Sequence, residues 1–222
     1  MMTTAKQTKK QLVAENAEAL KAMSVAELTQ FGRDHGCDSR AGFAAYKKAL
    51  AEIGIDFDAL RDQRREEKAE ARQAACTHEV TLISDAKART QRFGITDAAG
   101  NPVWFGRFFD DDRDFNGEQS SGEMAAAKKA VWLARQIGNA VGAQAVKLTL
   151  KVDAEWLTWA NGTDAKVGGK ARALREQAER CNICLEVVHI AGASNPADAL
   201  TVCSGYKKWQ DNDLAALASK LS

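Results

Sequence analysis

The chain has 222 residues, with 31 basic and 30 acidic side chains and a formal net charge of +1. This balance gives no global reason to expect a polyanionic partner, so a basic binding surface has to be local. The sequence has no run of about 18 apolar residues, the length needed to cross a bilayer, and the N-terminus lacks the apolar core of a secretory signal. We therefore expect a cytoplasmic protein without a membrane partner, whose five cysteines are free thiols.

Residues 1–76 predict an all-α accessory region. They are rich in Ala, Lys, Glu, Arg and Gln, which favour helices, and they contain no proline. Ser24 and Glu27 have the spacing of a capping box, which marks a helix start. We expect three or four helices, the last long and charged. Basic and acidic residues are nearly balanced here, which favours a protein partner or self-association over a grip on nucleic acid.

Residues 77–222 predict an α/β domain. Strands are expected in "EVTLISD", on both sides of the turn in "RFGITDAAGNPVWFGRFF", in the alternating "AVKLTLKVD" and in "ICLEVVHI". Helices are expected in "EMAAAKKAVWLARQIGNAVG", "AEWLTWANG", "GGKARALREQAERCN" and the terminal "DNDLAALASKLS". This order predicts a five-stranded mixed sheet, in which three antiparallel strands are followed by parallel additions, flanked by helices.

Four acids fall at comparable places in these elements. Asp85 ends the first strand, Glu123 lies in the first turn of the long helix, Asp153 ends the alternating strand and Asp198 begins the helix after the last strand. The C-terminal ends of parallel strands meet at one edge of a sheet, so the four carboxylates should lie close together. Glu123 also heads the apolar helix stripe that faces the sheet.

Clustered carboxylates repel one another, and oxygen-binding divalent ions such as Mg²⁺ or Mn²⁺ relieve that repulsion. Two such ions roughly 4 Å apart can support phosphodiester hydrolysis. Each acid alone has a plainer interpretation as a helix cap or a surface residue, which suits Asp198 in particular. Their joint order along the chain favours the metal site.

Four segments resemble the ribonuclease H family, in its type 1 and reverse-transcriptase-linked branch: "VTLISDAKA", "SSGEMAAAKKAVWLA", "LTLKVDAEWL" and "VVHIAGASNPADAL". The resemblance spans residues 79 to about 210. It implies an endonuclease that uses two Mg²⁺ or Mn²⁺ ions to cleave the RNA strand of an RNA–DNA hybrid, leaving a 3′-hydroxyl and a 5′-phosphate. Asp85, Glu123 and Asp153 would be the core ligands, and Asp198 would complete the second ion's site.

Other residues near these acids are candidates for substrate contact. Lys87 and Lys151 could bind phosphate, and Asn195 lies in the last motif. A solvated face of mixed charge is the alternative for the lysines. Many family members have a histidine in a flexible loop before the last aspartate. The candidate here for proton transfer is His189, but its apolar neighbours favour a packed structural histidine.

Two further readings of the function stay open. The same fold could carry a DNA exonuclease or a junction resolvase, although "NPAD" argues against this. It could also be a non-catalytic nucleic-acid-binding module, although idle clustered carboxylates would be destabilising.

A zinc site is a separate possibility. Its Cys₃His ligands would be Cys76, His78, Cys181 and Cys184. The alternative is that these cysteines are buried free thiols.

Overall fold

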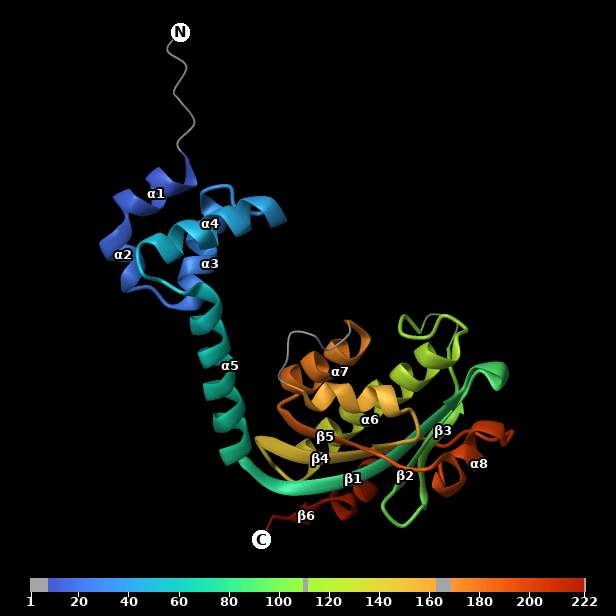
Figure 1. Cartoon of the computed structure of the whole chain (residues 1–222). Coiled ribbons are helices and arrows are strands. Elements are labelled where there is room, and N and C mark those ends of the chain that lie inside the picture. Colours follow the sequence, from blue (N-terminus) through green and yellow to red (C-terminus); the bar gives the residue numbers. More distant parts are fainter. Residues whose placement is uncertain (1–7, 110–111, 163–168, 222) are drawn as a thin grey trace. The chain divides into compact units, whose positions relative to one another are not determined.

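The computed structural model describes residues 8–109, 112–162 and 169–221. The chain forms two compact units, Met1–Lys68 and Ala69–Ser222, whose elements are labelled in Figure 1. The division of roles expected between residues 1–76 and 77–222 stays a prediction. No helix of the described residues has the length and apolar character needed to span a membrane.

Short helices build the first unit, and their ends follow local capping rules. Ser24 accepts a hydrogen bond from the Glu27 backbone, and the Glu27 carboxylate accepts one from the Ser24 backbone at 2.7 Å, so the predicted capping box is confirmed. The core surrounds Tyr46, whose hydroxyl donates to the Leu28 carbonyl at 3.1 Å. The helices are α1 (Lys9–Glu15), α2 (Ala17–Lys21), α3 (Val25–Asp34), α4 (Arg40–Glu52) and α5 (Phe57–Ala74), which continues into the second unit.

The second unit is built on one mixed sheet with the order β3-β2-β1-β4-β5. β1, β2 and β3 pair antiparallel, and β4 and β5 add parallel to β1. This arrangement confirms the predicted ribonuclease H-like sheet. Its strands are β1 (Cys76–Lys87), β2 (Arg92–Asp97), β3 (Pro102–Arg107), β4 (Ala145–Val152), β5 (Ile183–His189) and the short β6 (Ser219–Lys220).

The C-terminal segment differs from the single helix that its sequence predicts. It forms α9 (Asp211–Leu214) and a 3₁₀ turn η4 (Ala215–Leu217), then ends in β6, which pairs antiparallel with β1 at His78 and Glu79. β4 pairs with one side of this stretch, but the register with β2 begins only at Leu82, so the backbone groups on the other side would otherwise be unpaired. β6 covers that open edge, which stabilises the sheet.

Helices cover both faces of the sheet (Figure 1). α6 (Gln119–Ala140) packs against β1, β2 and β4 through a stripe with no exposed surface: Ala127, Ala130, Ala134 and Ile137. The stripe is the one that the sequence predicts. α7 (Gly169–Arg180) packs beside α6, whereas α8 (Asp198–Val202) packs against β1, β2 and β3. The 3₁₀ turns η1 (Ala88–Thr90), η2 (Glu155–Asn161) and η3 (Gly192–Ser194) follow β1, β4 and β5.

Gly94 fixes how closely α8 approaches the sheet. A Cβ atom built on Gly94 would lie 2.6 Å from the Leu200 Cβ and 2.7 Å from the Ala197 carbonyl oxygen. Gly94 is the cross-strand partner of Asp85, and directly opposed residues point to the same face of a sheet. Asp85 therefore points to the face that α8 covers.

Candidate active site

Asp85 is the buried acid of the candidate site. It lies two residues before the end of β1 rather than at the strand end that the sequence predicts, because β1 continues to Lys87. Its side chain is 6% exposed, and its Oδ1 atom accepts a hydrogen bond from the Ala86 backbone at 2.7 Å. An ionised carboxylate in such a place needs compensation from charge or hydrogen bonds.

The electrostatics of Asp85 show which acids lie near it. The pKa of Asp85 is raised to about 7, mainly by burial, next by the negative charge of Asp153 and to a smaller extent by that of Asp198. The Ala86 N–H and the Lys87 ammonium act in the opposite direction. Three of the four predicted acids therefore form one electrostatically coupled group.

Asp153 reaches this group through the parallel pairing of β1 and β4. Ile83 is in register with Lys151, so Asp153 follows two residues later at the level of Asp85 and on the same face. The loop after β5 passes close by, since a Cβ built on Gly192 would lie 3.4 Å from the Asp153 Oδ2 atom. The sequence therefore predicted correctly which strand end carries Asp153.

Asp198 is the first residue of α8, as expected, but it is not a helix cap. The N-cap position belongs to Ala197, where no side-chain cap bond is made. The Asp198 carboxylate instead accepts a hydrogen bond from the Lys87 ammonium, with Nζ 2.8 Å from Oδ1. This bond raises the pKa of Lys87. Lys87 is thus the internal counter-ion of the acid group.

Asn195 has a structural position rather than the substrate contact that we predicted. Its side chain is buried; Nδ2 donates to the Ser84 carbonyl at 3.3 Å, and Oδ1 accepts from the Ala197 backbone at 3.0 Å. These bonds tie the loop before α8 to β1, beside Asp85. Asn195 therefore positions Asp198 and offers little surface to a substrate.

Glu123 approaches from the other side of the sheet. Since α6 begins at Gln119, Glu123 is its fifth residue and lies beyond the predicted first turn. A Cβ built on the preceding Gly122 would lie 3.4 Å from the Ala86 Cβ. Ala86 points away from the face of Asp85, because successive strand residues alternate. Glu123 can therefore meet the three aspartates only around the end of β1.

Two neighbours outside the predicted set of site residues hold the Glu123 carboxylate. Trp156 Nε1 donates to Oε2 at 2.9 Å, and Gln119 Nε2 donates to Oε1 at 3.1 Å. Gln119 also donates to the Ala86 carbonyl at 2.6 Å and accepts from the Ala88 backbone at 3.0 Å, so it links Glu123 to the chain just after Asp85. The i,i+4 spacing of Gln119 and Glu123 could have predicted the contact between these two side chains.

Among the described residues, no hydrogen bond or ion pair joins Lys151 or His189 to the acids, and Lys151 is half-exposed. His189 is exposed, so the packed structural histidine that we preferred is wrong. It is the last residue of β5, which is the edge strand of the sheet, and it is in register with Val152 just before Asp153.

The four acids carry the oxygen donors that a divalent cation prefers, but in the structure they do not converge into a complete set of metal ligands. Their oxygens all belong to carboxylates, and the repulsion that raises the pKa of Asp85 is what a hard cation relieves. Across residues 8–109, 112–162 and 169–221, however, no three His, Cys, Asp or Glu side chains converge as a metal site. Lys87 holds Asp198, while Trp156 and Gln119 hold Glu123.

The cysteines form a thiol pair rather than the zinc site that the sequence left open. Cys76 and Cys184 have their sulfurs 3.1 Å apart, and burial raises the pKa of the Cys184 thiol to about 12. His78 Nδ1 lies 2.9 Å from the Thr77 hydroxyl. Among the described residues these side chains and Cys181 do not converge as a group of three or more metal ligands.

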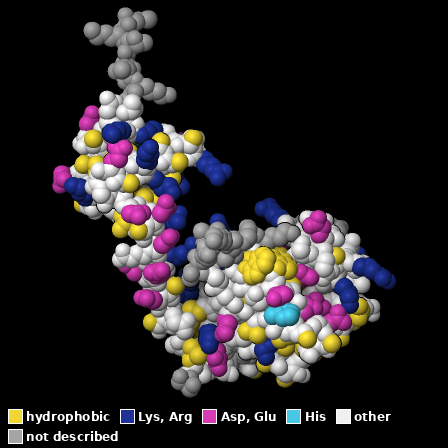
Figure 2. All heavy atoms as spheres, viewed as in Figure 1, with side chains coloured by type: hydrophobic (Ala, Val, Ile, Leu, Met, Phe, Trp, Pro, Cys, Tyr) yellow, Lys and Arg dark blue, Asp and Glu magenta, His cyan; other side chains and the backbone are white. Residues whose placement is uncertain are grey.

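Basic and acidic side chains are interspersed over the face shown in Figure 2, with no broad basic surface.

No protein-family model and no curated protein sequence matches the chain. Among solved structures, a ribonuclease H1 from the halophilic archaeon Halobacterium salinarum NRC-1 is similar over 55% of this chain and 93% of its own, with 18% identity and a TM-score of 0.38. Such a similarity says nothing about activity, which has to be judged from the residues of this chain.

Proposed function

We propose that the Ala69–Ser222 unit is a metal-dependent endonuclease that hydrolyses the RNA strand of RNA–DNA hybrids. The observation that carries the proposal is the buried Asp85 carboxylate, coupled to Asp153 and Asp198 at the end of the central strand. A buried acid beside two others destabilises the fold, and such groups are concentrated at functional sites. The choice of an RNA–DNA hybrid rests on the resemblance carried by the four motifs.

Asp85, Asp153 and Asp198, joined by Glu123, would hold two Mg²⁺ or Mn²⁺ ions. When bound, such ions supply an activated water and stabilise the leaving oxygen of a phosphodiester. The residues of this chain supply the rest. Lys87 orients the Asp198 carboxylate, and its ammonium could exchange that carboxylate for a substrate phosphate. Gln119 and Trp156 each donate a hydrogen bond to the Glu123 carboxylate and so fix its orientation.

The experiment is cleavage of end-labelled RNA–DNA hybrid, duplex DNA, duplex RNA and single strands with Mg²⁺ or Mn²⁺. Asp85→Asn and Asp153→Asn are compared with Asp213→Asn, which removes an exposed acid of α9 outside the site. Hybrid cleavage should fall by several orders of magnitude in the first two variants and stay unchanged in the third. Hybrid cleavage that survives both site substitutions contradicts the assigned site.

The substrate panel also decides between the remaining readings. Cleavage confined to duplex or single-stranded DNA would replace the hybrid endonuclease with a DNA nuclease on the same fold. Metal-independent binding without any cleavage would favour a binding module. The Lys87–Asp198 ion pair speaks for that last reading, because it already neutralises one of the acids from within the chain.

A further inference from the structure

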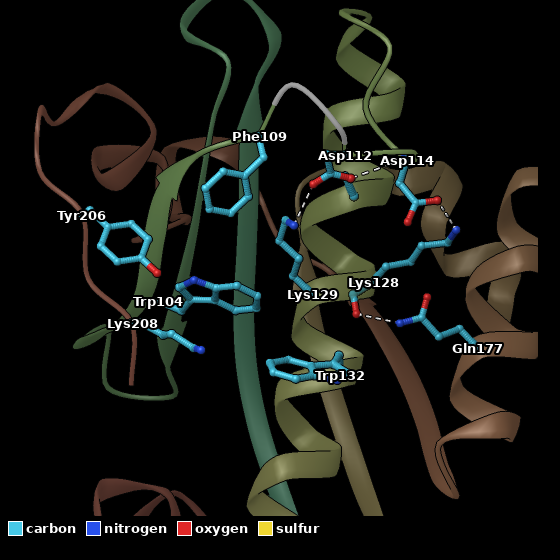
Figure 3. Close-up of a pocket in the computed structure, with 11 residues that line it drawn as sticks. Trp104, Phe109, Asp112, Asp114, Lys128, Lys129, Trp132, Gln177, Tyr206 and Lys208 are labelled. Atoms are coloured by element: carbon cyan, nitrogen blue, oxygen red, sulfur yellow. Dashed lines mark hydrogen bonds and ion pairs between the residues drawn. The ribbon is translucent and has the colours of Figure 1, made fainter. Parts of the chain in front are cut away.

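A second concave site lies on the α6 side of the sheet. It is a cavity of about 420 Å³ between β3, α6 and residues 206–208. Figure 3 shows Trp104, Phe109, Trp132 and Tyr206 around it. Phe109 is 65%, Tyr206 60% and Trp132 39% exposed. Exposed apolar residues are ordinary when scattered, but several large aromatic rings around one cavity indicate a binding site.

The cavity is closed to a cationic ligand by Lys129. The Lys129 ammonium lies 5.3 Å from the centre of the Phe93 ring and 5.5 Å from that of Trp104, and it pairs with Asp112 at 2.7 Å. The place that an aromatic cage would offer to a ligand cation is therefore occupied by a side chain of the protein. A second positive charge would also be repelled.

Among the described residues that line the cavity, the ammonium groups outnumber the carboxylates by one. Lys128 forms an ion pair with Asp114, so both carboxylates that line the described cavity are matched. Lys208 is the third ammonium, and within the described residues no carboxylate pairs with it; its Nζ lies 4.9 Å from the centre of the Trp209 ring. Aromatic walls and one unmatched ammonium favour a flat ring that carries an anionic group.

We propose that this cavity binds an unpaired base of a single-stranded nucleic acid, with the adjoining phosphate at Lys208. Base stacking on aromatic side chains tolerates any sequence, and a nearby ammonium supplies the phosphate contact. The cavity shares helix α6 with the candidate active site: Lys128 follows Glu123 by five residues, roughly 8 Å along the axis and about 140° around it. A strand that reaches both sites therefore has to pass around α6.

A free mononucleotide has the same chemistry, but a strand suits the surroundings better. Lys207 stands beside Lys208, with its ammonium on the Pro102 carbonyl and outside the cavity. Adjacent lysines match successive phosphates rather than one. The choice of nucleic acid rests on the proposed nuclease function, whereas binding can be measured without catalysis.

The test is binding of fluorescein-labelled oligothymidylate to the full chain in EDTA, followed by anisotropy. Trp132→Ala should weaken binding on the order of 5- to 100-fold, because stacking of one base is lost. Leu60→Ala is the matched control, since Leu60 is 38% exposed and lies in α5. Phe109→Ala, at a more exposed ring, repeats the test should Trp132→Ala disturb the fold by circular dichroism.

Charge is tested with a matched pair of lysines. Lys208→Ala should weaken oligothymidylate binding and lower the slope of log K against log salt by about one, while Lys207→Ala should do so less. Unchanged affinity in Lys208→Ala, or in both Trp132→Ala and Phe109→Ala, overturns the proposal. Thymidine monophosphate that binds as tightly as the strand, with the same response to Trp132→Ala, overturns the choice of a strand.

This outcome is separable from the proposed catalysis. Strand binding that depends on Trp132 in EDTA supports the cavity even if no substrate is ever cleaved. Conversely, hybrid cleavage that depends on Asp85 with no role for Trp132 leaves the nuclease standing and removes the cavity proposal.

Discussion

The Lys87 ammonium lies 2.8 Å from the Oδ1 atom of Asp198, across 111 residues of sequence. Lys87 comes two residues after Asp85 on β1, so a single cation serves two of the acids that we assign to metal binding. In the absence of metal, this lysine takes part of the place that a divalent ion would fill. The two cations should therefore compete.

Lys87→Met should tighten Mn²⁺ binding by roughly 2- to 5-fold. The pair is about half exposed, with side-chain exposures of 41% and 50%, and pairs of this kind contribute only about 0.2 to 1 kcal/mol. Isothermal titration without substrate measures the affinity directly. Lys151→Met is the control, since it removes the same charge from β4 without breaking a bond to an acid. Weaker Mn²⁺ binding in Lys87→Met would contradict the competition.

Trp156→Phe should lower kcat for hybrid cleavage on the order of 10-fold while leaving the hybrid Kd nearly unchanged. The substitution keeps an aromatic ring but removes the N–H that donates to Glu123 at 2.9 Å, and a hydrogen bond to a charged group contributes about 1.5 to 3 kcal/mol. Single-turnover kinetics separate this effect from binding. Trp159→Phe, at an exposed ring of the same 3₁₀ turn, should change neither quantity.

Gln119→Leu should act on the same carboxylate from its other oxygen. It removes the bond to Glu123 and the two bonds to the β1 end at Ala86 and Ala88. We expect a loss of kcat at least as large as that of Trp156→Phe, and a higher Mg²⁺ concentration for half-maximal rate. An unchanged metal dependence would show that Gln119 supports the fold and does not position Glu123.

Asp85→Asn should stabilise the metal-free protein, increasingly as pH rises. Burial raises the pKa of Asp85 to about 7, so the folded state prefers the protonated acid, and ionisation costs stability as pH rises from about 4 through 7. At about 1.4 kcal/mol per pKa unit, the gain at pH 8 is on the order of 2 to 4 kcal/mol. Urea unfolding in EDTA at pH 5 and pH 8 measures it. A gain that is equal at both pH values would show that Asp85 ionises freely.

The order of the strands and helices along the chain could be predicted from the sequence because it depends on local patterns. Alternation in β4 and the alanine stripe of α6 follow from burial of one face, which a single segment records. The side of the sheet from which each acid approaches does not depend on a local pattern. Asp85 and Glu123 reach the strand end from opposite faces because Asp85 points to the face that α8 covers, whereas α6 packs on the other face.

His189 and the C-terminal segment show a second limit. The apolar neighbours of His189 predicted a packed side chain, but β5 is the edge strand and its last residue is exposed. Residues 219–220 form a strand because β1 has an open edge there. Both outcomes depend on which strand edges the rest of the sheet leaves exposed, so neither can be predicted from the segment alone.

Tyr46 allows a test of the first unit that is independent of the acids. Its buried hydroxyl donates to the Leu28 carbonyl, and burial raises its pKa to about 12. Since the folded state disfavours the phenolate, stability is complete below pH 10 and is lost as pH rises toward 12. Absorbance at alkaline pH should therefore show a late step, in which Tyr46 ionises only as the first unit unfolds. Tyr46→Phe should remove that late step and cost about 1 kcal/mol at pH 7. Ionisation of Tyr46 near pH 10, with helical circular dichroism intact, would contradict its buried position.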